Sequence, residues 1–249
     1  MLNRIQIIQR LIRATGARTY LEIGVNTGTC FLRIKASRKL GVDPDLKIPV
    51  GRRLKYFVKN PTNLNSQYFE ETSDDFFEKH ADLLRAHRPE IVFIDGLHTY
   101  EQSLRDVLNS LKFLAEDGFI LMHDCNPLTK AAAYPARSFE DVVSLNLPDY
   151  GGIWNGDVWK SIVHLRSLHR DLDVCVLNCD HGIGVLRRGD GTSGASLSAD
   201  TIAGLTYEDL AANREQLLNL KSPEFLDKII AGVVTRRKAG PGSQRAPAR

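Results

Sequence analysis

Long apolar segments are missing from this 249-residue chain. No run approaches the roughly 20 residues that cross a bilayer, and Arg4, Arg10 and Arg13 interrupt the apolar positions near the N-terminus. Cysteine is also scarce, and the four cysteines match neither the spacing of a zinc site nor a secreted disulfide framework. These absences argue against a signal peptide, a membrane anchor and a membrane partner, and we expect a cytoplasmic protein.

Positive charge is concentrated at one end of the chain. The formal net charge is +3, but five basic residues and no acidic residue lie within residues 236–249. The remainder therefore carries a slight negative charge, which argues against a nucleic-acid partner. Because residues 236–249 are also poor in large apolar groups, we predict a disordered basic tail there. Residues 1–235 are long enough to form a single domain with its own core.

Short apolar runs alternate with helical patterns along most of the chain. Five runs are typical of buried strands: residues 19–23, 40–42, 67–71, 91–94 and 119–122. Residues 100–114 place leucine and valine on one stripe, as an amphipathic helix does. Such alternation implies a parallel sheet with right-handed crossovers.

The later part of the chain departs from this alternation. Residues 173–177 and 183–187 are two strand-like runs joined by a short hairpin-type connection, which predicts an antiparallel last strand. We therefore expect an α/β fold, with a Rossmann-like, seven-stranded, mostly parallel sheet and helices on both faces. Residues 126–158 are predicted to form an insertion on the substrate side, and residues 201–235 to form C-terminal helices.

Two glycines follow the first strand, in the sequence Glu22-Ile-Gly24-Val-Asn26-Thr27-Gly28. Their spacing allows a tight turn and lets a ligand approach backbone N–H groups at a helix start. A turn without any ligand would explain the same pattern.

Three polar residues lie at the ends of the next two strands. Asp43 ends the second strand, where a carboxylate can accept hydrogen bonds from both hydroxyls of a ribose. Thr72 and Ser73 open a helix after the third strand, and capping of that helix is their first expected role. The same two side chains could contact the edge of an adenine.

The segments Tyr20 to Gly28 and Gly41 to Asp43 resemble the first two motifs of class I S-adenosylmethionine-dependent methyltransferases. The order of elements through residue 190 is similar to theirs. This resemblance implies S-adenosylmethionine as cofactor, with its methionyl part on the glycine loop, its ribose on Asp43 and its adenine beside Ser73. The expected cofactor-binding residues are Glu22, Gly24, Asn26, Thr27, Gly28, Asp43, Thr72, Ser73 and Asp95.

Polar side chains also follow the fourth and fifth strands, in Asp95-Gly-Leu-His98 and His123-Asp124-Cys-Asn126. A hydroxyl that attacks a methyl group must lose its proton, so a base or an acidifying metal would help. His98 could be the base, and Asp95 and Asp124 could share a hard cation such as Mg²⁺ with the substrate. Helix capping by Asp95, or a loop-holding role for His123 and Asp124, would explain these residues without catalysis.

This region resembles the metal-dependent sugar and antibiotic O-methyltransferases, in which Asp-Gly-x-His supplies a metal ligand and the base. The resemblance implies His98 and Asp95 as catalytic residues and Asp95, His123 and Asp124 as the metal site. His123 departs from that family's pattern, because it stands where a glutamate is usual. A neutral imidazole brings no charge, which predicts weaker magnesium binding or a softer divalent metal.

Aromatic and hydrogen-bonding side chains are interspersed in the insertion. Aromatic faces beside polar groups suit a sugar ring, and the predicted substrate contacts are Asn126, Tyr134, Trp154 and Asp157. Trp159 fits the core better, since it continues the helical spacing of the apolar residues after it.

The sequence thus predicts an O-methyltransferase that acts on a hydroxyl of a small molecule, with a sugar or a glycosylated metabolite as the expected acceptor. No tyrosine is followed four residues later by lysine, which argues against a short-chain dehydrogenase. The Asn-Pro-Pro-Tyr-like turn of many amino-group methyltransferases is also missing. Two alternatives stay open: a catalytically silent binding protein of the same fold, and a methyltransferase with a non-hydroxyl acceptor. The exposed C-terminal helices could pair two copies into a homodimer.

Overall fold

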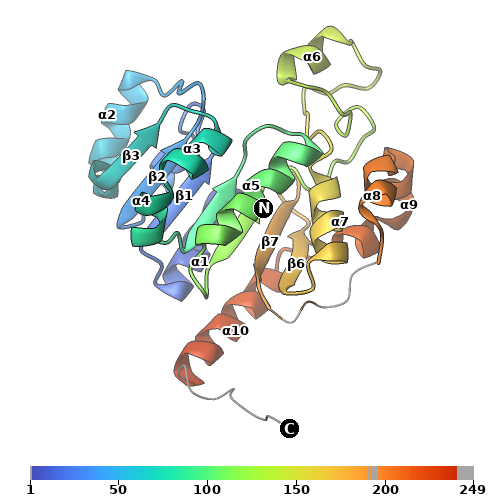
Figure 1. Ribbon diagram of the computed structural model, residues 1–249. Coiled ribbons are helices and arrows are strands. Elements are labelled where there is room, and N and C mark those ends of the chain that lie inside the picture. Colours follow the sequence, from blue (N-terminus) through green and yellow to red (C-terminus); the bar gives the residue numbers. More distant parts are fainter. Residues whose placement is uncertain (1, 190, 192–195, 240–249) are drawn as a thin grey trace.

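The computed structural model describes residues 2–189, 191 and 196–239 (Figure 1). Eight strands form one sheet: β1 (Thr19–Ile23), β2 (Arg38–Val42), β3 (Ser66–Phe69), β4 (Ile91–Ile94), β5 (Phe119–Met122), β6 (Leu172–Leu177), β7 (Ile183–Arg188) and β8 (Leu220–Lys221). Their order is β3-β2-β1-β4-β5-β7-β6-β8. Strands β1 to β5 are parallel, and β7 runs antiparallel to both of its neighbours. The predicted Rossmann-like sheet is confirmed, with the two-residue strand β8 added beside β6, too short for sequence periodicity to reveal.

Helices cover both faces of this sheet. They are α1 (Arg4–Thr15), α2 (Val50–Lys59), α3 (Ser73–Lys79), α4 (Ala81–Ala86), α5 (Tyr100–Phe113), α6 (Phe139–Ser144), α7 (Trp159–Leu168), α8 (Ala199–Gly204), α9 (Tyr207–Leu218) and α10 (Phe225–Ala239), with short 3₁₀ helices η1 (Phe31–Arg33) and η2 (Pro61–Asn65). Alternate residues of β1 point to opposite cores: Leu21 packs with α3, α5 and α7, whereas Tyr20 packs with α1, η1 and α10. The strands are therefore buried on both sides, which explains their continuous apolar runs.

The segment after β1 differs from the expected strand-turn-helix. Only the three-residue helix η1 forms there, in place of an α-helix. The side chains of Asn60 and Asn63 donate hydrogen bonds to the carbonyl of Leu32, and Asn60 also donates to that of Ile34. Side-chain amides thus satisfy carbonyls that a regular helix would have paired along the backbone.

The C-terminal boundary also needs correction. Helix α10 continues to Ala239, so residues 236–239 of the predicted tail are helical. Residues 240–249 of that prediction lie outside the described residues. None of the described helices is both long and apolar enough to cross a bilayer.

Candidate functional site

A cavity of about 740 Å³ opens where β1, β2, β3 and β4 end. Seven of the nine predicted cofactor-binding residues line it: Glu22, Gly24, Asn26, Thr27, Thr72, Ser73 and Asp95. Gly28 and Asp43 are not in the lining. The lining also includes residues 138–140, from the insertion and the start of α6. Helix α6 lies at the top of the molecule in Figure 1.

The turn after β1 is fixed by close backbone packing. Gly24 has a φ of 89°, and a Cβ there would lie 2.0 Å from the carbonyl oxygen of Asp95. Only glycine fits this position. The backbone N–H groups of Asn26 and Asp45 donate to the two carboxylate oxygens of Asp43, at 2.7 and 2.8 Å. Asp43 therefore holds the glycine loop. Each of its carboxylate oxygens keeps a lone pair for a further hydrogen bond, so contact with a ribose hydroxyl stays a prediction.

Glu22 lies at the inner end of this loop and is buried. Its carboxyl accepts a hydrogen bond from the Tyr20 hydroxyl. Burial raises the pKa of Glu22 to about 8, although the Tyr20 hydrogen bond and the charge of Lys39 act in the opposite direction. Glu22 is thus mostly protonated at neutral pH and can donate as well as accept a hydrogen bond.

A polar cluster missed by the sequence analysis lies beside Ser73. The Ser73 hydroxyl donates to Asp106 Oδ1 at 2.6 Å, and Gln102 Nε2 donates to the same oxygen at 3.0 Å. Asp106 is 1% exposed, and burial raises its pKa to about 6. The available signal was the spacing of Gln102 and Asp106, which are one helical turn apart within an otherwise leucine-rich helix.

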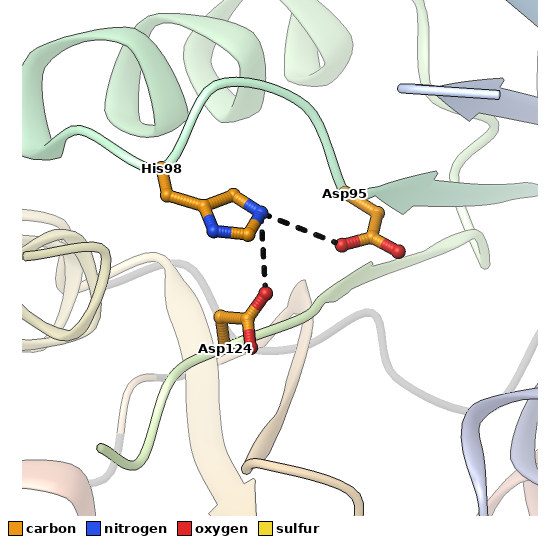
Figure 2. Close-up of side chains that lie close together, drawn as sticks. All are labelled: Asp95, His98 and Asp124. Atoms are coloured by element: carbon orange, nitrogen blue, oxygen red, sulfur yellow. Dashed lines mark ion pairs between the residues drawn. The ribbon is translucent and has the colours of Figure 1, made fainter. Parts of the chain in front are cut away.

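The ends of β4 and β5 bring three predicted residues together, as Figure 2 shows. His98 Nε2 lies 3.2 Å from Asp124 Oδ2 and 3.8 Å from Asp95 Oδ1. His98 Nδ1 lies 2.8 Å from the carbonyl oxygen of Trp154 and so carries a proton that it donates. Burial lowers the pKa of His98, but the two carboxylates outweigh it and the net shift is upward.

His123 sits deeper in the same cluster and contacts both carboxylates. Its Nδ1 lies 2.8 Å from Asp124 Oδ2 and 3.2 Å from Asp95 Oδ1. Burial opposes its charge, but the carboxylates raise the pKa of His123 well above the usual value. Arg4 Nη1 also lies 3.5 Å from Asp95, and the Arg4 backbone N–H donates to Asp180 at 2.7 Å. Arg4 and Asp180 were both missed, because only folding brings the start of α1 and the β6–β7 turn to this edge.

The donor atoms can be compared with those that a divalent metal needs. Asp95, His98 and Asp124 offer ligand atoms that all lie within 4.8 Å of one another. Two carboxylates and one imidazole suit a divalent cation, so the residues fit one. The histidine among these three candidate ligands is His98, whereas the sequence analysis predicted His123 as the metal ligand. The positive charges of Arg4 and His123 beside it would weaken metal binding.

The predicted substrate residues are divided between the cavity and its surroundings. Trp154 lines the cavity, and its ring centroid lies 5.1 Å from that of His98. Asn126 pairs with Asn178 and Arg214, Tyr134 accepts a hydrogen bond from the Trp154 indole, and Asp157 accepts from the backbone N–H of Tyr100. These three are not in the cavity lining, and substrate contact by them stays a prediction. Trp159 is buried in the core, as predicted.

Residues 21–125 match a family model described as a methyltransferase domain. That segment contains the glycine loop, Asp43, Ser73 and both strand ends of the charged cluster. The fold is that of a class I methyltransferase. The family match and the shared fold both point to a methyltransferase domain.

Solved structures share this methyltransferase fold at low sequence identity. A Staphylococcus aureus protein assigned as a caffeoyl-CoA O-methyltransferase is 14% identical, with 76% of this chain and 85% of that chain covered and a TM-score of 0.53. The O-methyltransferase TomG from Streptomyces achromogenes, solved with S-adenosylmethionine, is 12% identical, with 74% and 79% covered and a TM-score of 0.52. The methyltransferase PaMTH1 from Podospora anserina, solved with S-adenosylhomocysteine, is 18% identical, with 76% and 80% covered and a TM-score of 0.50. A search of curated proteins finds no match.

Proposed function

We propose that this protein transfers a methyl group from S-adenosylmethionine to a hydroxyl of a small molecule, a sugar or a glycosylated metabolite. The observation that carries the proposal is one cavity that joins the glycine loop and Ser73 to His98 and Asp95. Similar structures of O-methyltransferases support oxygen as the acceptor atom. Trp154 beside His98 supplies an aromatic face on which a sugar ring can pack.

In this mechanism the bound cofactor supplies an electrophilic methyl group on its sulfonium, and S-adenosylhomocysteine is the product. His98 Nε2 accepts the proton of the acceptor hydroxyl while that oxygen forms its bond to the methyl carbon. The Trp154 carbonyl holds the ring in the required tautomer, and Asp124 and Asp95 stabilise the imidazolium that forms. Holding both reactants in one cavity contributes a further part of the acceleration.

The second candidate is a metal-assisted form of the same reaction, which the convergence of Asp95, His98 and Asp124 favours. These three residues would hold Mg²⁺ or another divalent cation, which lowers the pKa of a bound hydroxyl. The Nε2 lone pair of His98 cannot ligate a cation and accept a proton at once. The two forms therefore assign different roles to His98.

One titration tests the proposal. Purified protein is titrated with S-adenosylhomocysteine, with and without Mg²⁺ or Mn²⁺, beside an Asp43→Ala control. We expect micromolar binding that the control loses, followed by methylation in a screen of hydroxylated acceptors. Methylation that survives exhaustive chelation rules out the metal-assisted form. Tight binding without turnover on any hydroxyl would favour the silent binding protein, and no binding under any condition refutes the proposed function.

A further inference from the structure

Helix α2 carries an apolar stripe, formed by Val50, Leu54 and Val58, that faces away from the rest of the described chain. The three side chains are 74%, 61% and 84% exposed. They follow one another at four-residue intervals, so they lie on one face of the helix. Exposed apolar side chains are normally scattered singly, and a row of three indicates contact with another surface.

Helix α2 lies beside the edge strand β3 (Figure 1) and binds the protein through its polar side. Arg52 Nη1 donates a hydrogen bond to the carbonyl of Thr27 at 2.8 Å, and the Tyr56 hydroxyl accepts one from Arg33 at 2.8 Å. An amphipathic helix normally buries its apolar side against its own core. Here that side is exposed, so the amphipathic pattern of α2 serves an external partner.

The chain around the stripe is positively charged. Residues 46–69, which include α2 and η2, contain five basic residues and no acidic residue: Lys47, Arg52, Arg53, Lys55 and Lys59. Arg53, Lys55 and Lys59 are exposed. Contact between the α2 helices of two copies would bring these like charges together, whereas an anionic surface would attract them.

A cavity of about 420 Å³ between α1 and the end of η1 adjoins α2. Four basic residues and no acidic residue line it: Arg10, Arg13, Arg33 and Lys35. Arg10 also pairs with Asp227 of α10. Arg33 connects the cavity with α2, because it lines the cavity and donates to the Tyr56 hydroxyl. The apolar stripe and the basic cavity are therefore neighbours on the surface.

We propose that this surface, the apolar stripe together with the basic cavity, docks on a lipid bilayer that contains anionic lipids. The stripe enters the interface between headgroups and acyl chains, and the surrounding cations contact lipid phosphates. Such a bilayer presents an apolar layer and an anionic layer over its whole area, so it contacts the stripe and the cavity together. Nucleic acid, another polyanion, offers no apolar layer to the stripe.

This contact is peripheral and differs from the membrane partner that the sequence analysis argued against. An interfacial helix lies in the plane of the headgroups, so it needs none of the long apolar runs that cross a bilayer. Only three apolar side chains insert, and the rest of the contact is electrostatic. We therefore expect reversible binding that requires anionic lipid and weakens as salt screens the cations.

The test is co-sedimentation of the full chain with vesicles of phosphatidylcholine alone, or of phosphatidylcholine and phosphatidylglycerol in equal parts. We expect binding to the anionic vesicles to be about 10-fold tighter or more, and to fall in high salt. The triple variant Val50→Ser, Leu54→Ser, Val58→Ser keeps every cation but removes the stripe, and should bind about 10-fold more weakly or less. Wild-type protein that sediments with neither vesicle, or equally with both, overturns the proposal.

Leu128→Ser is the matched control, because Leu128 is also highly exposed, at 71%, but lies outside α2. It should bind as the wild-type protein does. Undiminished binding by the triple variant overturns the proposal, and so does sedimentation velocity that finds a wild-type oligomer and a monomeric triple variant, because the stripe would then join copies of this chain. Thermal unfolding checks that the variants fold. Vesicle binding is measured without S-adenosylmethionine, so its outcome is independent of the proposed function.

Discussion

The two ends of the cavity are built in different ways. At the ends of β1 and β2, the shape comes from the main chain: a glycine turn packed against the Asp95 carbonyl, and backbone N–H groups held by one carboxylate. At the end of β4, it comes from the charged side chains of Arg4, Asp95 and His98, which pair with two further aspartates and a second histidine outside the lining. Steric fit therefore determines the structure of the first end, and electrostatic interactions determine that of the second. We expect substitutions of similar size to affect stability and ligand binding differently at the two ends.

The largest effect is expected from adding one methyl group at the main-chain end. In Gly24→Ala, the new Cβ would collide with the Asp95 carbonyl, and the positive φ would be strained. We expect a loss of about 2–4 kcal/mol in the free energy of unfolding and no detectable binding of S-adenosylhomocysteine. Chemical denaturation and calorimetry measure both. Gly51→Ala is the control, since a Cβ there meets nothing within 4 Å; normal binding by Gly24→Ala would contradict the steric account.

A side-chain change at the charged end should reduce the rate and leave the fold intact. In His98→Gln, the group proposed to accept the hydroxyl proton is lost while a polar side chain stays beside Asp124. We expect kcat to fall by about 100-fold or more with the affinity for S-adenosylhomocysteine within about 3-fold of wild type. His87→Gln is the control, because His87 is the C-cap of α4 and does not line the cavity. Full activity of His98→Gln would remove His98 from the mechanism.

The smallest effect is expected from a substitution of Glu22, which lies between the two ends of the cavity and changes how stability depends on pH. Its pKa in the folded protein, about 8, is above the ordinary value of 4.5, so the folded state favours the protonated carboxyl. The stability that the protonated Glu22 carboxyl contributes is complete at acidic pH and is lost as the pH rises toward 8. In Glu22→Gln the neutral form is permanent, and we expect it to be more stable than wild type at pH 9 by on the order of 1–2 kcal/mol. Thermal unfolding at pH 6 and pH 9 tests this, and an equal pH dependence in both proteins would contradict it.

The sheet and the glycine loop were predictable because both depend on local patterns. Continuous apolar runs mark strands buried on both faces, and Gly24 and Asp95 end such runs. Even so, the segment after β1 forms η1 in place of an α-helix, because Asn60 and Asn63, about 30 residues later, pair with its carbonyls. No local pattern contains that information.

The charged end of the site was only partly predictable. The polar residues at the strand ends identify Asp95, His98 and Asp124. The helical pattern of residues 4–15, by contrast, predicts that Arg4 faces solvent on an amphipathic helix. It reaches Asp95 only because α1 packs under the sheet. The same limit applies to Asp106, whose polar character within α5 reads as an exposed face until α3 is placed beside it.

The pairing of α1 with α10 bears on how this protein is made. Arg4 belongs to α1, whose apolar face shares a core with Leu226 and Val233 of α10, and Arg10 pairs with Asp227 across the two helices. Because the ribosome synthesises the chain from its N-terminus, α1 emerges some 200 residues before its partner helix α10. A nascent chain that has not reached residue 225 already contains every strand and loop that lines the cavity, but the helix that positions Arg4 is not yet covered. The charged end of the cavity is therefore expected to be completed after the glycine loop, once α10 has been synthesised.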